Sequence, residues 1–214
     1  MSSRRKLWLV GLSHHSAPVE VREQLAFENG AVSAAIRKLL DLPGIEEGAV
    51  VSTCNRVEIL ACGDAEKADS RPLAEFLARE RGVTAGRLED HLYVHEDREA
   101  IRHLFRVASS LDSMVVGEPQ ILGQLKQFYA LAAESGGAGT VLHRAFHKAF
   151  SVAKRVRTET GIAGKNVSVA SVAVELATQI FETLGDKTAM VIGAGKMSGL
   201  TARYLQSRGI GAII

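Results

Sequence analysis

Short apolar runs alternate with stretches of helical spacing along the first hundred residues. Each apolar run is bounded by polar or turn-forming residues, which predicts a strand. The predicted strands lie at 7–12, around Val50, around Ile59 and at 92–94. The predicted helices lie at 18–25, 30–40 and after Pro72, where Leu73, Phe76 and Leu77 share a face. The order predicts an α/β (α+β) fold whose sheet is of the split βαβ, or ferredoxin-like, type.

The next stretch of the chain adds helices to this arrangement. Apolar residues recur at helical spacing at 97–109, 120–134 and 140–160, and a glycine-rich break lies at 135–139. The helix predicted at 140–160 is amphipathic. Its apolar side holds Ala145, Phe146, Ala149, Val152, Ala153 and Val156, and its polar side holds Arg144, Lys148 and Arg155.

A different pattern begins after a predicted boundary at 161–164. The predicted elements are a helix at 167–181, a buried strand at 188–192, a helix that ends near 207–209 and a strand at 210–214. Between the first strand and the second helix stands Gly193-Ala194-Gly195-Lys196-Met197-Ser198. Strand, Gly-x-Gly and helix together are typical of a dinucleotide-binding unit, so these six residues are the predicted cofactor loop. We therefore divide the chain into domains 1–160 and 161–214, the second being the start of a Rossmann-type domain.

The nucleotide-binding pattern is incomplete in two respects. Its third small position is Ser198 and not glycine. The residue that reads the ribose is expected about 20 residues after the loop, where the chain reaches Ile214. The choice between NADP and NAD therefore stays open.

Composition excludes several classes of protein. Hydrophobic residues make up 46% and charged residues 23%, as in folded globular chains, and the net charge of +2 creates no field that demands a nucleic acid or a membrane. No apolar run reaches the roughly 18 residues of a membrane helix, and the basic N-terminus is followed by too short an apolar run for a signal peptide. We predict a cytoplasmic protein with no membrane partner. Cys54 and Cys62 do not form a disulfide framework, and Cys62 receives no role.

The segment Ser52-Thr53-Cys54-Asn55-Arg56 carries the first candidate chemistry, because it places a thiol in a polar turn between two strands. A nearby guanidinium favours the thiolate, which is the nucleophilic form of cysteine. Thr53 and Asn55 add hydrogen-bonding groups to the turn. The residues alone leave open whether Cys54 is a nucleophile or a small buried cysteine that fills space.

Two histidine pairs have a spacing of four residues, His91 with His95 and His143 with His147. Only the second pair lies in a predicted helix, and it lacks the glutamate of a His-Glu-x-x-His zinc site. We therefore predict no metal site.

Several stretches, in the same order and spacing, make the chain resemble the glutamyl-tRNA reductase family over its whole length. They are Gly11–Glu23, Ser52–Arg56, Ser109–Gln124, Ala145–Phe150, Val167–Val172 and the Gly193 loop. The resemblance implies an oxidoreductase that uses NADPH to reduce glutamyl-tRNA(Glu) to glutamate-1-semialdehyde, the first step of tetrapyrrole (porphyrin, 5-aminolevulinate) biosynthesis. Family members have a catalytic domain, an NADPH domain and a C-terminal dimerisation domain. This chain would hold the first and the beginning of the second, so we expect it to form the thioester without completing hydride transfer.

The resemblance also assigns roles to residues and partners. Cys54 would be the nucleophile, forming a glutamyl thioester that NADPH reduces, and His103 would be the histidine that activity requires. The family's substrate contacts fall on Thr53, Asn55, Arg56, Ser113, Glu118, Pro119, Gln120 and Gln124, and its NADP loop falls on Gly193–Ser198. The implied partners are glutamyl-tRNA(Glu), glutamate-1-semialdehyde aminotransferase and a second copy of the protein, as a homodimer.

The chemistry of these residues supports the implied roles. A thioester accepts hydride well because sulfur leaves readily and donates weakly to the carbonyl. Arg56 is the expected partner of the substrate's side-chain carboxylate, because its guanidinium fork matches two oxygens. His103 lies about 200° around its helix from Ile101, away from the apolar stripe. We therefore expect a surface or cleft residue rather than a core histidine, and in the family reading one that orients the carbonyl or moves a proton.

Two rival functions remain from the sequence. The first is a non-catalytic tRNA-binding or regulatory fragment. Salt-dependent tRNA binding without an adduct on Cys54 would favour it. In the reductase reading, five basic residues of the 140–160 helix are candidates for contact with tRNA phosphates, although they can also be a solvated face: Arg144, Lys148, Lys154, Arg155 and Arg157. The second is an ordinary NAD(P)-dependent dehydrogenase of small molecules, which leaves the Cys54 turn and the Ser113–Gln124 stretch unexplained.

Overall fold

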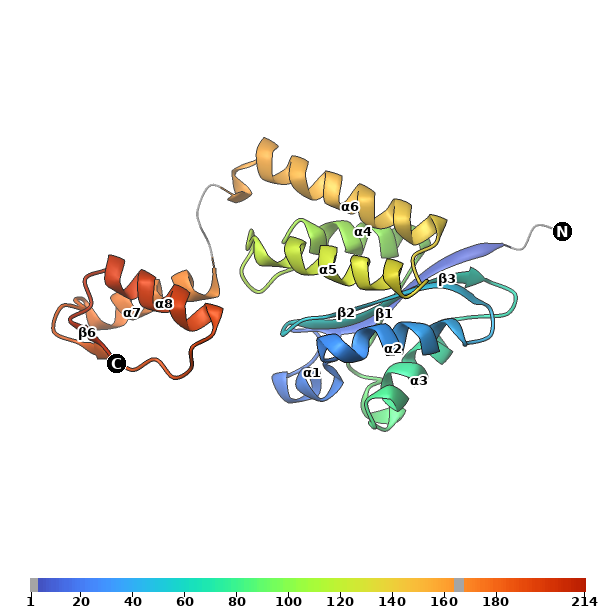
Figure 1. Ribbon diagram of the computed structural model, residues 1–214, viewed down its shortest axis with the longest axis horizontal. Helices are drawn as coiled ribbons and strands as arrows, with labels where there is room; N and C mark the ends of the chain where they lie inside the picture. The colour runs from blue at the N-terminus through green and yellow to red at the C-terminus, as the bar shows by residue number, and fades with distance from the viewer. Residues whose placement is uncertain (1–3, 164–167) are drawn as a thin grey trace.

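The computed structural model describes residues 4–163 and 168–214 and centres on a four-stranded antiparallel sheet (Figure 1). The strands are β1 (Arg5–Ser13), β2 (Ile45–Ser52), β3 (Arg56–Asp64) and β4 (Tyr93–Glu96). Their order across the sheet is β2-β3-β1-β4, and each neighbouring pair is antiparallel. This order, with a helix after β1 and another after β3, confirms the predicted ferredoxin-like arrangement.

Helices cover both faces of the sheet (Figure 1). One face carries α1 (Val19–Leu25), α2 (Asn29–Leu40) and α3 (Arg71–Glu80), and the other carries α4 (Asp97–Ala108), α5 (Gln120–Glu134) and α6 (Thr140–Glu159). Short 3-10 turns lie at Ala85–Arg87 and Gly161–Ala163. The predicted helices therefore exist, and their predicted ends agree with the observed ones to within two residues. Cys62, expected just beyond a strand, lies inside β3 and is buried.

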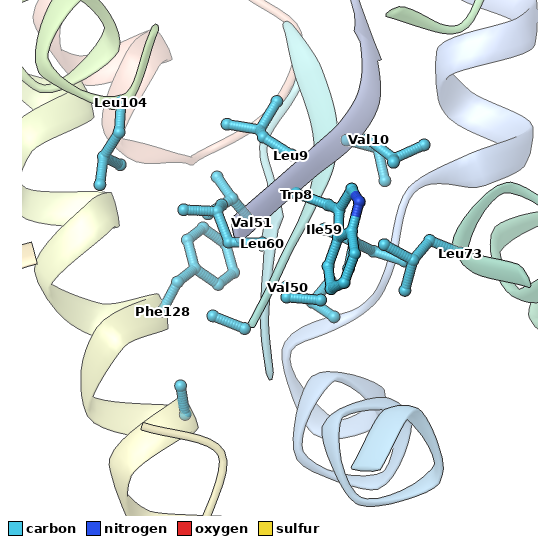
Figure 2. Close-up of a cluster of buried hydrophobic side chains, with 14 of the residues drawn as sticks. Trp8, Leu9, Val10, Val50, Val51, Ile59, Leu60, Leu73, Leu104 and Phe128 are labelled. Atoms are coloured by element: carbon cyan, nitrogen blue, oxygen red, sulfur yellow. The ribbon is translucent and has the colours of Figure 1, made fainter. Parts of the chain in front are cut away.

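The two-residue period of the strands sends alternate side chains into two apolar layers (Figure 2). Trp8, Val10 and Ile59 face the α2 and α3 side, whereas Leu9 and Leu60 face α4 and α5, where Leu104 and Phe128 meet them. Arg56 and Glu58 have the same parity along β3 as Leu60. Their charged side chains therefore point toward the layer of α4, α5 and α6.

The C-terminal part is a smaller unit with its own core. It contains α7 (Val169–Phe181), β5 (Thr188–Ala189), α8 (Lys196–Ser207) and β6 (Ala212–Ile213), and β5 pairs with β6 in parallel. Val174, Leu184 and Leu205 form the buried centre. The strand–loop–helix–strand order confirms the predicted start of a Rossmann-type unit.

Some details of this part differ from the sequence expectations. The strands predicted at 188–192 and 210–214 are only two residues long, although the Val191 N–H still donates to the Ile214 carbonyl at 2.8 Å. Met190 and Ile192, expected to be buried, are exposed, because no neighbouring element covers them within residues 4–163 and 168–214. Residues 164–167 lie outside the described part. They include Val167, the predicted start of the helix at 167–181, and the last residue of the predicted 161–164 boundary. Among the described residues, none of the helices is long and apolar enough to cross a membrane.

Candidate active site

Cys54 lies at the tip of the hairpin that joins β2 to β3. The Thr53 N–H donates to the Arg56 carbonyl at 2.8 Å, and the N–H groups of Asn55 and Arg56 both donate to the Thr53 hydroxyl at 3.2 Å. The Thr53 side chain therefore holds the turn from inside. Cys54 is exposed, so the space-filling role that the sequence left open is excluded.

A cavity of about 420 Å³ opens beside this turn. It brings together side chains from the hairpin, the segment before α5 and α5 itself. Its walls include Thr53, Cys54, Asn55, Arg56, Ser113, Glu118, Gln120, Ile121 and Gln124, with Val169 and Met197 from the C-terminal part. Every predicted substrate-contact residue except Pro119 lines this cavity; Pro119 is exposed at the start of α5.

Arg56 is almost completely buried and already engaged. Its Nη1 donates to Glu58 Oε1 at 2.8 Å, and its Nη2 donates to the Asp112 carbonyl and, at 3.1 Å, to the Asp112 carboxylate. Burial opposes the charge of Arg56, but Glu58 and Asp112 raise its pKa above the usual value. The free two-pronged fork expected from the sequence is therefore not present. Nε is the guanidinium nitrogen without a partner in the described part of the chain.

Glu58 receives three donors on one oxygen. Besides Arg56, the Tyr93 hydroxyl donates to Oε1 at 2.5 Å and His103 Nε2 lies 2.7 Å from it. Burial alone raises the pKa of Glu58, but Arg56, His103 and Tyr93 outweigh burial and lower it to about 2. A carboxylate only accepts hydrogen bonds, so His103 Nε2 must carry its hydrogen.

His103 does not line the Cys54 cavity. It is buried and not at the open surface, because Glu58 and Tyr93 of the sheet cover one side of it, so of the two expected positions the cleft applies and the surface does not. It reaches a separate hollow of about 280 Å³. The other residues of that hollow are His95, Glu99, Arg102, Arg106 and Asp112. His103 contacts Glu58, Glu58 pairs with Arg56, and Arg56 lines the Cys54 cavity, so these contacts link His103 to the cavity through Glu58 and Arg56.

The loop before α5 gives the cavity its carboxyl group. Ser110 and Gly117 have positive φ angles of 59° and 89°, and the Ser110 hydroxyl donates to the Glu118 carbonyl at 2.6 Å. Glu118 is buried, and burial raises the pKa of its carboxyl group. The cavity thus contains an acceptor for a cation as well as the thiol.

The glycine loop adjoins the same cavity. Gly193 has φ +102° and Gly195 is the N-cap of α8, with no side-chain cap on the helix. A Cβ at Gly195 would meet no atom within 4 Å, so the backbone there is open to a ligand. Met197, in the first turn of α8, lies at the cavity wall, and its Sδ is 3.8 Å from Gln120 Nε2.

The histidine pair on α6, His143 and His147, surrounds a tyrosine hydroxyl. His143 and His147 both contact the Tyr129 hydroxyl, at 2.6 and 3.2 Å. Within residues 4–163 and 168–214, the structure places no group of three or more His, Cys, Asp and Glu side chains that could hold a metal ion. On α6, Arg144, Lys148, Lys154 and Arg155 are exposed and Arg157 is half-buried.

Sequence reasoning missed four residues around the site: Arg22, Glu58, Tyr93 and Asp112. Glu58 gave the clearest signal, since a charged residue two positions after Arg56 in an apolar strand shares its face. Arg22, which contacts the Cys54 turn, gave none, because its partners lie 32 and 33 residues away.

Comparison with known proteins places this geometry in a family. The model of the glutamyl-tRNA(Glu) reductase N-terminal domain matches residues 10–160, and that of shikimate/quinate 5-dehydrogenase matches residues 175–214. The glutamyl-tRNA reductases of Syntrophotalea carbinolica and Pelobacter propionicus are 51% and 54% identical over 206 and 201 residues, covering 96% and 94% of this chain and 46% of each relative.

A solved structure agrees with the sequence comparison. Glutamyl-tRNA reductase from Methanopyrus kandleri matches with a TM-score of 0.66 and 39% identity, over 97% of this chain and 48% of that one. The chain spans about half the length of the relatives it matches. Because the first family model covers most of the chain and includes the Cys54 hairpin, the chain belongs to the glutamyl-tRNA reductase family.

Proposed function

We propose that this chain carries the acyl-transfer site of an NADPH-dependent glutamyl-tRNA reductase, with Cys54 as the nucleophile. The observation that carries the proposal is an exposed thiol at the edge of a polar cavity, on a turn that matches the family. A non-catalytic tRNA-binding role would need no accessible thiol there. A dehydrogenase of free small molecules would explain the glycine loop but not the hairpin.

The reaction would proceed in two steps. The Cys54 thiolate attacks the ester carbonyl of glutamyl-tRNA(Glu), a C–S bond forms, and the ester C–O bond breaks as the tRNA hydroxyl leaves with a proton. The nicotinamide cofactor, when bound, supplies the hydride that reduces the thioester carbonyl. The C–S bond then breaks, which releases glutamate-1-semialdehyde and restores the Cys54 thiolate.

The cavity has groups for the rest of the substrate. Glu118 would accept hydrogen bonds from the α-ammonium group, and Gln120 and Gln124 can donate to or accept from the amino-acid moiety. Arg56 would offer its Nε and its positive potential to the side-chain carboxylate, shared with Glu58 and Asp112. His103 would act through this network, by orienting Arg56, rather than on the carbonyl directly.

The residues at 193–198 fit a dinucleotide phosphate. The positive φ of Gly193 makes the turn, the open backbone at Gly195 leaves room, and the uncapped start of α8 offers N–H donors. These residues would hold the pyrophosphate of NADPH beside the wall of the Cys54 cavity. The homodimer, the aminotransferase partner and the cytoplasmic location are parts of the proposal that rest on family membership alone.

Trapping the acyl group on Cys54 tests the proposal. Glutamyl-tRNA(Glu) is incubated with the protein without NADPH, and the peptide that contains Cys54 is examined by mass spectrometry. We expect a glutamyl adduct in the wild type and in Cys62→Ala, whose buried thiol is removed as a matched control, and none in Cys54→Ser. Salt-dependent tRNA binding without any adduct would instead support the non-catalytic rival.

A further inference from the structure

Arg22 joins α1 to the tip of the Cys54 hairpin. Its side chain is buried, its Nη1 donates to the Cys54 carbonyl at 2.5 Å and lies 3.4 Å from Asn55 Oδ1, and its Nε donates to the Ala17 carbonyl at 3.2 Å. No carboxylate pairs with Arg22 in the part of the chain that the structure describes. All three contacts go to neutral oxygens, so this guanidinium holds a local shape rather than balancing a charge.

The contact with Asn55 has a chemical consequence. A guanidinium only donates hydrogen bonds, so the Asn55 atom that faces Arg22 must be the amide oxygen. The Asn55 nitrogen, with its two hydrogens, is then left for the cavity that this residue lines. Arg22 thereby determines both where the Cys54 main chain lies and which group Asn55 presents to a substrate.

The hairpin tip has few other supports. The Thr53 hydroxyl holds it from inside, the Thr53 N–H donates to the Arg56 carbonyl at 2.8 Å, and the His14 N–H donates to the Asn55 carbonyl at 2.9 Å. None of these contacts reaches the Cys54 carbonyl. Without Arg22 the peptide group after Cys54 would keep the bond from the Asn55 N–H to the Thr53 hydroxyl, but its carbonyl would lose the Arg22 donor, so the position of the sulfur would be less firmly held.

We propose that Arg22 is a positioning residue for the Cys54 nucleophile, a role that rests on the proposed acyl transfer. It clamps the tip of the hairpin so that the sulfur faces the cavity and Asn55 offers its N–H donors there. Misplacing a reacting atom by about 1 Å can cost about 100-fold in rate. Loss of the clamp should therefore slow acyl transfer much more than it lowers stability.

The test compares Arg22→Met and Arg22→Lys with Arg81→Met. Arg81 is a matched control, because it also donates from Nε to a carbonyl of the α1 region, that of Gln24 at 3.3 Å, but it does not touch the hairpin. In single-turnover glutamyl transfer to Cys54, we expect Arg22→Met to be about 30- to 100-fold slower and Arg81→Met to stay within about two-fold of wild type. Added guanidinium ion should restore part of the rate in Arg22→Met only. Arg22→Lys keeps the charge and should fold if Arg22→Met does not, with an intermediate rate.

A second measurement does not depend on the substrate. Amide hydrogen exchange of Asn55 and Arg56 should become faster in Arg22→Met and Arg22→Lys but not in Arg81→Met. If the wild type forms no glutamyl adduct, the proposed function fails while the exchange result still decides whether Arg22 holds the tip. The inference is overturned if exchange at the tip is unchanged in both Arg22 variants, or if a wild type that forms the adduct is matched by Arg22→Met within about two-fold.

Discussion

One buried oxygen atom, Oε1 of Glu58, accepts hydrogen bonds from side chains of two strands and a helix. It accepts from Arg56 on its own strand, from Tyr93 on β4 and from His103 on α4. Each donor would otherwise be a buried polar group with an unmet hydrogen bond. Because breaking a buried ion pair by removing one partner typically costs about 3–5 kcal/mol, Glu58 should be as important for folding as for the site.

Glu58→Gln should alter how stability depends on pH. The folded-state pKa of Glu58 is about 2, below the ordinary 4.5, so its carboxylate stabilises the folded protein fully above pH 4.5 and loses that effect as the pH falls toward 2. The free energy of unfolding of the variant should lie roughly 3 kcal/mol below that of wild type at pH 7, and the two curves should converge near pH 2. Urea unfolding at a series of pH values measures both curves.

A surface carboxylate provides the comparison for this prediction. Glu159 pairs with Arg155 at 3.0 Å on the exposed side of α6, and water screens such an exposed pair so that it contributes little to stability. Glu159→Gln should therefore follow the wild-type curve closely. Parallel curves for Glu58→Gln and wild type from pH 7 to pH 2 would show that the Glu58 carboxylate is not specially stabilised.

At the scale of elements, the site depends on loops that fix where helices begin. The segment from Ser110 to Glu118 turns back on itself between α4 and α5 and thereby brings Ser113 and Glu118 to the cavity. Gly117 is the tightest point of this loop. It has φ +89°, and a Cβ there would lie 2.5 Å from the Ile162 carbonyl oxygen.

Gly117→Ala should therefore destabilise the protein by about 1–3 kcal/mol, from left-handed backbone strain and a main-chain clash, and should reduce adduct formation on Cys54. Gly123→Ala is the matched control, since Gly123 lies inside α5 with no atom within 4 Å of its missing Cβ. An alanine at that position should stabilise by about 0.5–1 kcal/mol. Thermal unfolding and adduct yield are measured for both, and loss of similar size in the two variants would contradict the account of the loop.

The sequence predicted helices and strands well, because the spacing of apolar residues within one segment determines them. It predicted the burial and contacts of single side chains less well, because these depend on residues far away in the sequence. The strands of the main sheet and the helices on both its faces follow from local alternation and helical spacing. The burial of His103 depends on Glu58, 45 residues away in the sequence, which no helical wheel can show. The role of Arg22 was not predicted for the same reason, since its partners Cys54 and Asn55 are also distant in the sequence. The apolar residues Met190 and Ile192 predicted a buried strand, but a strand is buried only where other elements pack against both of its faces.

At the scale of the whole molecule, the described residues form two separate apolar cores, and a division at residue 160 stays a prediction. The larger core runs from Leu7 to Ala153, and the smaller one contains Val174, Leu184 and Leu205. The C-terminal part also exposes large apolar side chains. Examples are Leu176, Ile180, Phe181, Met190 and Ile192.

The division predicts that residues 1–160 fold alone. The shortened protein should melt within a few degrees of the 214-residue chain, because its core is complete. It should bind less of a dye that reports exposed apolar surface, because it lacks the exposed apolar side chains of the C-terminal part. A chain ended at residue 145, which lacks Phe146, Ala149 and Ala153 from the core, should unfold and serves as the control. Loss of the melting transition in 1–160 would show that the two parts fold as one.

The wall that Val169 and Met197 contribute to the Cys54 cavity has a kinetic consequence. If Cys54 is acylated as proposed, the acyl group would be covered by the C-terminal part, which under the same proposal binds the reductant. If the C-terminal part moved away, water would reach the thioester carbonyl, and hydrolysis would release free glutamate in place of the aldehyde. Under the proposed function, the ratio of glutamate to aldehyde released would therefore report how well the C-terminal part shields the thioester from water.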